Sequence, residues 1–140
     1  MKYWLCVTNE GNWQTIKEKK VWGVPAKRGK RQMEAVKRGD CLIFYVKPKR
    51  IGGIFEAASE PFESSEKVFS WAEFGRPEIF PHRVRLRPVR VPNEPVSFET
   101  LIGKLSFTRG RKRWSIVLRR AMLEISEEDY RLILNSMSRK

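Results

Sequence analysis

Residues 41–57 read CLIFYVKPKRIGGIFEA, an apolar run, a basic turn and a second apolar run. The first six residues are all apolar, as expected for a strand that is buried on both faces. The turn leads into 51–57, which we predict to be the hairpin partner of that strand. Two adjacent glycines inside the second strand, Gly52 and Gly53, indicate a bulge, or another chain or ligand passing close to the backbone. This stretch therefore predicts a β-hairpin in the middle of the chain.

Shorter elements lie on both sides of this hairpin. Strand-like or extended patterns occupy four further segments: 2–8, 21–25, 80–87 and 114–118. Helices are expected in three places: after Asn12, which we expect to cap the first, over 31–37, and from Ser126 onward. No linker or repeat divides the chain, so residues 1–140 are expected to form one α+β domain. We predict a small mixed β-barrel or strongly bent sheet of about six strands with peripheral helices.

The C-terminal helix carries a start signal and an apolar stripe. Ser126 is expected to cap it, and Asp129 three residues later completes a capping-box pattern. Helical spacing predicts that one face is buried, made of Tyr130, Ile133, Leu134 and Met137.

Charge is the strongest compositional signal. The chain has 29 Lys and Arg residues against 16 Asp and Glu, a formal net charge of +13 with a pI near 10.2. Such an excess attracts polyanions, and RNA or DNA is the expected partner of a soluble basic domain. Three basic segments, 27–31, 83–90 and 109–113, predict a phosphate track if the fold brings two of them onto one surface. A membrane is not expected as a partner, because no basic helix with a wide apolar face is evident.

The segment 83–90 has a period of two. Arg83, Arg85 and Arg87 alternate with Val84 and Leu86, which places the arginines on one face of a strand and the apolar residues on the other.

Cysteine and histidine content narrows the class of protein. The chain has 2 Cys and 1 His, and both Cys6 and Cys41 fall in strand-like apolar runs, so we expect buried free thiols rather than a disulfide. This set does not make a zinc site, and no metal or cofactor is expected. No apolar run approaches the roughly 20 residues of a membrane helix, and no secretory signal is evident, which predicts a cytoplasmic or nuclear protein. The abundance of Lys, Arg and Glu hints at a thermophile.

Catalytic motifs are weak in this sequence. His82 is the single histidine, and its position at a strand edge favours a surface role over a catalytic one. Gly29-Lys30 lacks the rest of a phosphate-binding loop. We therefore expect a binding protein rather than an enzyme. The alternative, a small nuclease or base-processing enzyme, requires an acid-base pair, either Asp40 with Lys30 or His82 with Glu78.

Four of the five tryptophans divide into two groups. Trp4 and Trp114 fall within strand-like runs and are expected to pack in the core. Trp22 and Trp71 fall where regular structure is expected to give way to loop. A tryptophan in such a place can wall a pocket that stacks a flat base, although ordinary packing remains the alternative.

Several segments, taken in order, are similar to the EVE domain family, kin of YTH domains in the PUA-like superfamily. They are Tyr3-Trp4-Leu5, Val21-Trp22-Gly23-Val24, Gly39-Asp40 with Tyr45, the glycine hairpin strand 51–57, the strand 81–87 and the final helix. Their order and spacing carry the resemblance over nearly the whole chain.

The resemblance implies a PUA-like pseudo-barrel that holds a single flipped, often modified, base in an aromatic pocket. By position, Trp22 and Trp71 would be the walls of the pocket, and Thr8 and Asn9 would face the base edge. Gly23 and Val24 would complete the pocket. The nucleic-acid backbone would meet two basic groups: Lys27, Arg28, Lys30 and Arg31 in one, and Arg109, Lys112 and Arg113 in the other.

Two departures from the family pattern bear on the ligand. The family commonly has Arg-Asn after Trp-Gly-Val, whereas this chain has Pro25-Ala26, and Glu63-Ser64-Ser65 does not match the usual Asp-x-Thr. Both predict an altered base preference. The choice between RNA and DNA, the modified base, the oligomeric state and the pathway are left open by the sequence.

Overall fold

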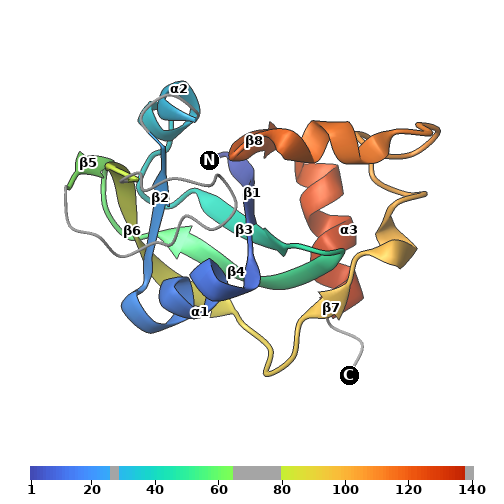
Figure 1. Cartoon of the computed structure of the whole chain (residues 1–140), viewed down its shortest axis with the longest axis horizontal. Coiled ribbons are helices and arrows are strands. Elements are labelled where there is room, and N and C mark those ends of the chain that lie inside the picture. The colour runs from blue at the N-terminus through green and yellow to red at the C-terminus, as the bar shows by residue number, and fades with distance from the viewer. Residues whose placement is uncertain (26–28, 65–79, 138–140) are drawn as a thin grey trace.

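A mixed, curled sheet forms the centre of the structure (Figure 1). The computed structural model describes residues 1–25, 29–64 and 80–137. Its elements in chain order are β1 (Tyr3–Thr8), α1 (Glu10–Lys19), β2 (Val21–Val24), α2 (Lys30–Glu34), β3 (Cys41–Val46), β4 (Arg50–Ala57), β5 (Phe62–Glu63), β6 (His82–Arg90), β7 (Val96–Ser97), the 3-10 helices η1 (Glu99–Leu101) and η2 (Trp114–Arg119), β8 (Met122–Ile125) and α3 (Glu127–Met137).

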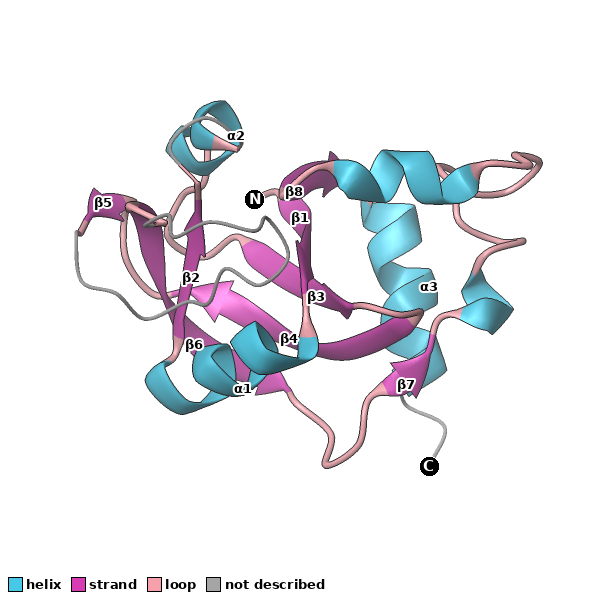
Figure 2. Ribbon diagram, viewed as in Figure 1, coloured by secondary structure: helices cyan, strands magenta, loops and turns pink. Residues whose placement is uncertain are grey.

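Six strands make the main path of the sheet, in the order β2-β6-β4-β3-β1-β8, with β5 beside β6 and β7 beside β4. The parallel pair β1–β3 is mixed with antiparallel pairs on either side. Figure 2 shows the helices at the periphery, with α2 above the sheet, α1 below it and α3 to the right. The predicted α+β class, with a strongly bent sheet of about six strands, is therefore confirmed. None of the helices in the described residues is long and apolar enough to cross a membrane.

The predicted central hairpin is present. All six residues of β3 are buried, and β3 pairs antiparallel with β4. The register of that pair shifts between Phe44 and Tyr45, next to the two glycines. A Cβ atom at Gly52 would lie 2.5 Å from the ring of Trp13 on α1. The bulge predicted from the adjacent glycines is found, and the group that lies against the backbone at Gly52 is the Trp13 ring.

Both faces of the sheet are covered, which explains the continuous apolar run of β3. One core cluster contains Phe44 with three buried tryptophans, Trp4, Trp13 and Trp22. The other cluster contains Ile43, the residue just before Phe44, under α3 and the segment around η1. Because neighbouring strand residues point to opposite faces, a strand between two cores must be apolar throughout.

Helix α1 begins earlier than predicted. Asn9, not Asn12, is its N-cap, and the Oδ1 atom of Asn9 accepts a hydrogen bond from the backbone N–H of Asn12 at 2.8 Å. Asn9 has the extended backbone that a cap requires, whereas Asn12 already lies in the first turn and is buried. Helix α2 is shorter than the predicted 31–37, and the predicted strand 80–87 is β6 at His82–Arg90.

The predicted strand at 114–118 is wrong, because these residues form the 3-10 helix η2. Trp114, Val117 and Leu118 pack against the core under α3. These positions are i, i+3 and i+4, a spacing that places side chains on one face of a helix but not of a strand. Strand β8, a few residues later, occupies the place beside β1.

Helix α3 confirms part of its predicted start. The Oγ atom of Ser126 accepts a hydrogen bond from the N–H of Asp129 at 3.1 Å, as a capping residue does. The Asp129 carboxylate, however, accepts bonds from the N–H and hydroxyl of Ser106 and so anchors the segment before η2. Ile133 and Met137 are buried, and the other two residues of the predicted stripe are partly buried.

Candidate functional site

A hollow opens at the end of β1, between β2, the start of α1 and the turn between η2 and β8. Its volume is about 40 Å³. The residues that line it are Val7, Thr8, Asn12, Trp22, Pro25, Lys47, Phe80, Leu118, Arg119, Arg120 and Ala121. The backbone N–H of Val7 donates to the carbonyl of Ala121 at 2.9 Å, which holds the turn against β1.

Trp22 supplies the inner wall of the hollow. It lies within β2, which is buried along its whole length, and not at the boundary with a loop that the sequence indicated. Its ring is 2% exposed and packs edge-on against Phe44, with ring centroids 5.4 Å apart. The indole Nε1–H of Trp22 has no hydrogen-bond partner among the residues that the structure describes. A buried donor without a partner destabilises a protein by about 1–3 kcal/mol, so such groups call for an explanation.

Two further buried polar side chains line the same hollow. Thr8 is 4% exposed and Asn12 is 5% exposed. Of the pair expected at the base edge, Thr8 lines the hollow, whereas Asn9 caps α1 next to it. Asn12 was missed by the sequence reasoning, which placed it at a helix cap. The hollow is therefore lined by one indole donor that has no partner among the described residues. It is also lined by two side chains of types that can both donate and accept hydrogen bonds.

The rim of the hollow is cationic. Lys47, Arg119 and Arg120 line it, and all three are exposed. The two arginines also line a second hollow, together with Gly29 and Gln32 of the α2 segment. The sequence noted the basic character of this region but did not single out these three residues. Only the fold shows that they lie beside Trp22.

The described residues expected to meet the nucleic-acid backbone are exposed but do not line this hollow. Arg109, Lys112 and Arg113 are exposed in the turns before η2, and none of them lines the hollow. Lys30 and Arg31 are exposed on α2, where Lys30 Nζ lies 4.0 Å from a Glu34 carboxylate oxygen. Gly23 and Val24 are buried in β2 beside Trp22 but do not line the hollow. Trp71, Lys27 and Arg28 lie outside the described residues.

Arg83 is buried, unlike the other two arginines that the period of two places on the same face of β6. It is 3% exposed, and its Nε–H donates to the Phe80 carbonyl at 2.7 Å. Strand β5 pairs with β6 here, with Phe62 opposite Arg83, and the Arg83 Nη1–H donates to the Ser64 hydroxyl just after β5 at 3.2 Å. Arg85 and Arg87 lie beyond β5 and are exposed, as predicted.

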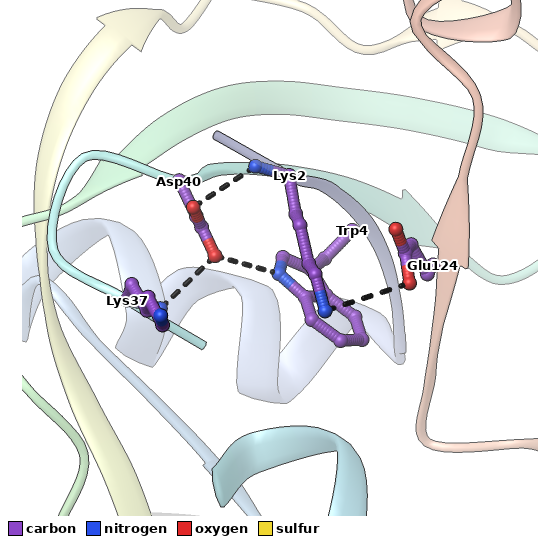
Figure 3. A network of polar contacts seen from close by, with 5 residues as sticks. All are labelled: Lys2, Trp4, Lys37, Asp40 and Glu124. Carbon is purple, nitrogen blue, oxygen red and sulfur yellow. Dashed lines mark hydrogen bonds and ion pairs between the residues drawn. The ribbon is translucent and has the colours of Figure 1, made fainter. Parts of the chain in front are cut away.

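Three residues of the enzyme alternative, Asp40, Lys30 and His82, do not line the hollow. The Asp40 carboxylate is buried and accepts three N–H hydrogen bonds, from Trp4 Nε1 and from the backbone of Lys2 and Lys37 (Figure 3). His82 Nδ1 lies 3.9 Å from a Glu63 carboxylate oxygen. Glu78 lies outside the described residues. Asp40 thus ties the start of β1 to the turn before β3.

Comparison with known proteins agrees with this fold. The family model for the EVE domain matches residues 2–136. The chain belongs to the EVE domain family. This EVE domain is 47% identical to a UPF0310 protein of Pyrococcus abyssi, covering 95% of this chain and 97% of the relative. It is 39% identical to a UPF0310 protein of Pyrococcus horikoshii, with the same coverage. Relatives from Pyrococcus are compatible with the thermophilic composition.

Solved structures share the fold of this EVE domain at low sequence identity. The protein Atu2648 of Agrobacterium tumefaciens matches with a TM-score of 0.67 at 18% identity, covering 99% of this chain and 94% of that one. The YTH domain of the Zygosaccharomyces rouxii MRB1 protein, solved with N6-methyladenosine RNA, matches with a TM-score of 0.64 at 18% identity, covering 98% and 88%. The predicted kinship with YTH domains is confirmed at the level of fold.

Proposed function

We propose that this EVE domain is a non-catalytic nucleic-acid reader that takes one flipped, modified base of RNA or DNA into the hollow beside Trp22. The observation that carries the proposal is the buried Nε1–H of Trp22, which has no partner among the described residues. Every nucleobase carries acceptor atoms on its edge, and one of them would accept this hydrogen bond. Thr8 and Asn12 would bind the remaining donors and acceptors of the base edge.

The energy balance permits such a reader to prefer a methylated base. Flipping a base out of its stack costs a few kcal/mol, and stacking against an aromatic side chain returns about 1–3 kcal/mol. A buried methyl group adds roughly 0.8 kcal/mol. The likeness in fold to a YTH domain solved with N6-methyladenosine RNA supports this preference by analogy. Trp71 is proposed as the second wall of the pocket.

The cationic rim would hold the phosphates on either side of the flipped base. Lys47, Arg119 and Arg120 line the hollow, and the net charge of +13 attracts the nucleic acid from a distance. We propose further backbone contacts at the residues that the sequence indicated: Lys27, Arg28, Lys30, Arg31, Arg109, Lys112 and Arg113. Phosphate contacts of this kind position the strand but do not read the sequence.

The hollow must widen to accept a base. A volume of about 40 Å³ holds only a few water molecules. Arg119 and Arg120 are exposed side chains that line it. We therefore propose that binding the phosphates draws these two side chains away and opens the hollow at the same time.

A binding titration tests the proposal. Short single-stranded and double-stranded oligonucleotides, each with and without one methylated base, are titrated at two salt concentrations. We expect a preference for one methylated base that persists at the higher salt concentration. Binding that ignores methylation and collapses with salt would mean that the basic surface acts alone, and products formed from labelled oligonucleotides would favour the enzyme alternative.

A further inference from the structure

Ile116 is an exposed large apolar residue in an unusual place. The described residues include three such side chains: Met1 at 79%, Val89 at 50% and Ile116 at 44% exposed. A single exposed apolar residue is common and needs no explanation by itself. Ile116, however, belongs to η2, the element whose last residues, Leu118 and Arg119, line the hollow.

Helix η2 has an inner and an outer face. Trp114, Val117 and Leu118 pack inward against the core under α3. Ile116 and Arg119 are exposed on the outer face. A 3-10 helix has three residues per turn, so these two side chains stand above one another, about 6 Å apart along the axis. Bases on one strand are spaced by about 3.4 Å, so Ile116 stands within about two base steps of the mouth of the hollow.

The stretch of sequence on both sides of Ile116 carries only positive charge. No acidic residue occurs between Glu99 and Glu124, while Arg111, Lys112 and Arg113 precede η2 and two arginines end it. Figure 1 shows this orange segment before β8 extending beyond the sheet at the upper right. An apolar side chain that projects between cations is suited to a site where phosphates lie on both sides and an apolar base stack lies between them.

A base that leaves a duplex leaves a gap in the stack and an unpaired partner base. Proteins that distort duplexes commonly insert an isoleucine, leucine or phenylalanine between base steps. We propose that Ile116 is such a wedge, which fills the gap left by the base in the Trp22 hollow, and that the ligand of this domain is therefore double-stranded. This inference rests on the proposed function.

The test compares Ile116→Ala with Val89→Ala, a matched loss of one exposed apolar side chain on β6. The probes are a 14-base-pair DNA duplex and its single strand, each carrying one N6-methyladenine or one 5-methylcytosine. We expect Ile116→Ala to raise the Kd for the methylated duplex by about tenfold and to leave the Kd for the single strand unchanged, because a single strand has no gap to fill. Val89→Ala should change neither, and circular dichroism should show both variants folded.

The outcomes separate the wedge from the proposed function. If the wild-type protein prefers a methylated base but Ile116→Ala binds the duplex normally, or loses both ligands equally, the wedge is wrong and the reader stands. If the wild-type protein prefers no methylated base in either DNA form, the wedge fails, and the RNA oligonucleotides of the titration described above decide whether the proposed function fails with it. Loss of binding to phosphatidylserine vesicles on Ile116→Ala, with duplex binding unchanged, would instead assign this segment to a membrane surface.

Discussion

The indole Nε1–H of Trp4 donates a hydrogen bond to Oδ2 of Asp40 over 3.1 Å, although 36 positions separate the two residues in the chain. The same carboxylate accepts the backbone N–H groups of Lys2 and Lys37, both at 3.0 Å. Asp40 therefore closes the parallel β1–β3 pair at the end where both strands begin. Trp22, in the same core cluster, has an indole donor without such an acceptor among the described residues.

Removing the Asp40 carboxylate should destabilise the fold. Asp40→Ala leaves a buried indole N–H without an acceptor and frees two backbone N–H groups, so we expect the free energy of unfolding to fall by about 3 kcal/mol. Urea denaturation measures it. Glu124→Ala is the control, because Glu124 forms only an exposed ion pair with Lys2 at 3.9 Å and should change stability by less than about 0.5 kcal/mol. Equal losses in the two variants would refute the role of Asp40.

Loss of the indole donor should affect base recognition at Trp22 but fold stability at Trp4. Trp22→Phe removes the unpaired donor, so we expect loss of the preference for a methylated base with a stability loss of only about 1–2 kcal/mol. Trp4→Phe removes a donor that is satisfied by Asp40, so it should weaken the fold but keep the base preference. Oligonucleotide titration and urea denaturation of both variants check this contrast. A base preference that survives Trp22→Phe would exclude the indole donor from recognition.

The Trp13 ring leaves no room for a side chain at Gly52 of the central hairpin. A Cβ at position 52 would lie 2.5 Å from Trp13, a ring that is 1% exposed and cannot move aside. We expect Gly52→Ala to destabilise the domain by about 1–3 kcal/mol. Gly103→Ala, where a Cβ meets nothing within 4 Å, is the control and should be nearly neutral. Thermal unfolding of the two variants distinguishes them, and equal midpoints would contradict the packing described for Gly52.

The arginines at the mouth of the hollow should contribute affinity without selectivity. Replacing both Arg119 and Arg120 with alanine should weaken binding of methylated and unmethylated oligonucleotides by the same factor. The slope of log K against log salt concentration should become shallower by about 0.9 for each lost phosphate contact. The control removes the same charge at Arg87 and Arg131, which are engaged by Glu56 and Glu127. An equal effect of the control pair would mean that net charge, and not this rim, binds the phosphates.

Both cysteines should be inert while the protein is folded. Burial raises the pKa of the Cys6 thiol well above its usual value, and burial also raises the pKa of Cys41. The thiolate is the reactive form, so alkylation by iodoacetamide at pH 8 should be slow in the native protein and fast after unfolding. Mass spectrometry of alkylated samples measures this, and rapid native labelling of Cys6 would contradict its burial.

Sequence patterns within a few residues predicted the elements whose structure depends mainly on neighbouring residues. The apolar run of β3, the glycine bulge of β4 and the Ser126 cap were all found as expected. Where two local solutions compete, the sequence was less informative. Asn9 and Asn12 are both suitable caps, and only the backbone conformation at Asn9 decides between them.

Features set by distant segments could not be read from the sequence. The alternation of Arg83 with its neighbours does not reveal that its side chain is buried and hydrogen-bonded to the distant Ser64 hydroxyl. Likewise, nothing local in Arg119 and Arg120 indicates that they lie beside Trp22, about a hundred residues earlier in the chain. The site therefore depends on the pairing of β1 with β8, which is a long-range contact.

The indole N–H resonance of Trp22 is the most direct probe of the proposed reader. In a ¹H–¹⁵N spectrum it is assigned by its absence from Trp22→Phe, and it is followed as a methylated or an unmethylated oligonucleotide is added. We predict a large downfield shift with the preferred methylated oligonucleotide and a small one without the methyl group, because the buried donor then gains an acceptor. A Trp22 resonance that stays in place while the backbone resonances of Arg119 and Arg120 move would show that nucleic acid binds only the rim and that no base enters the hollow.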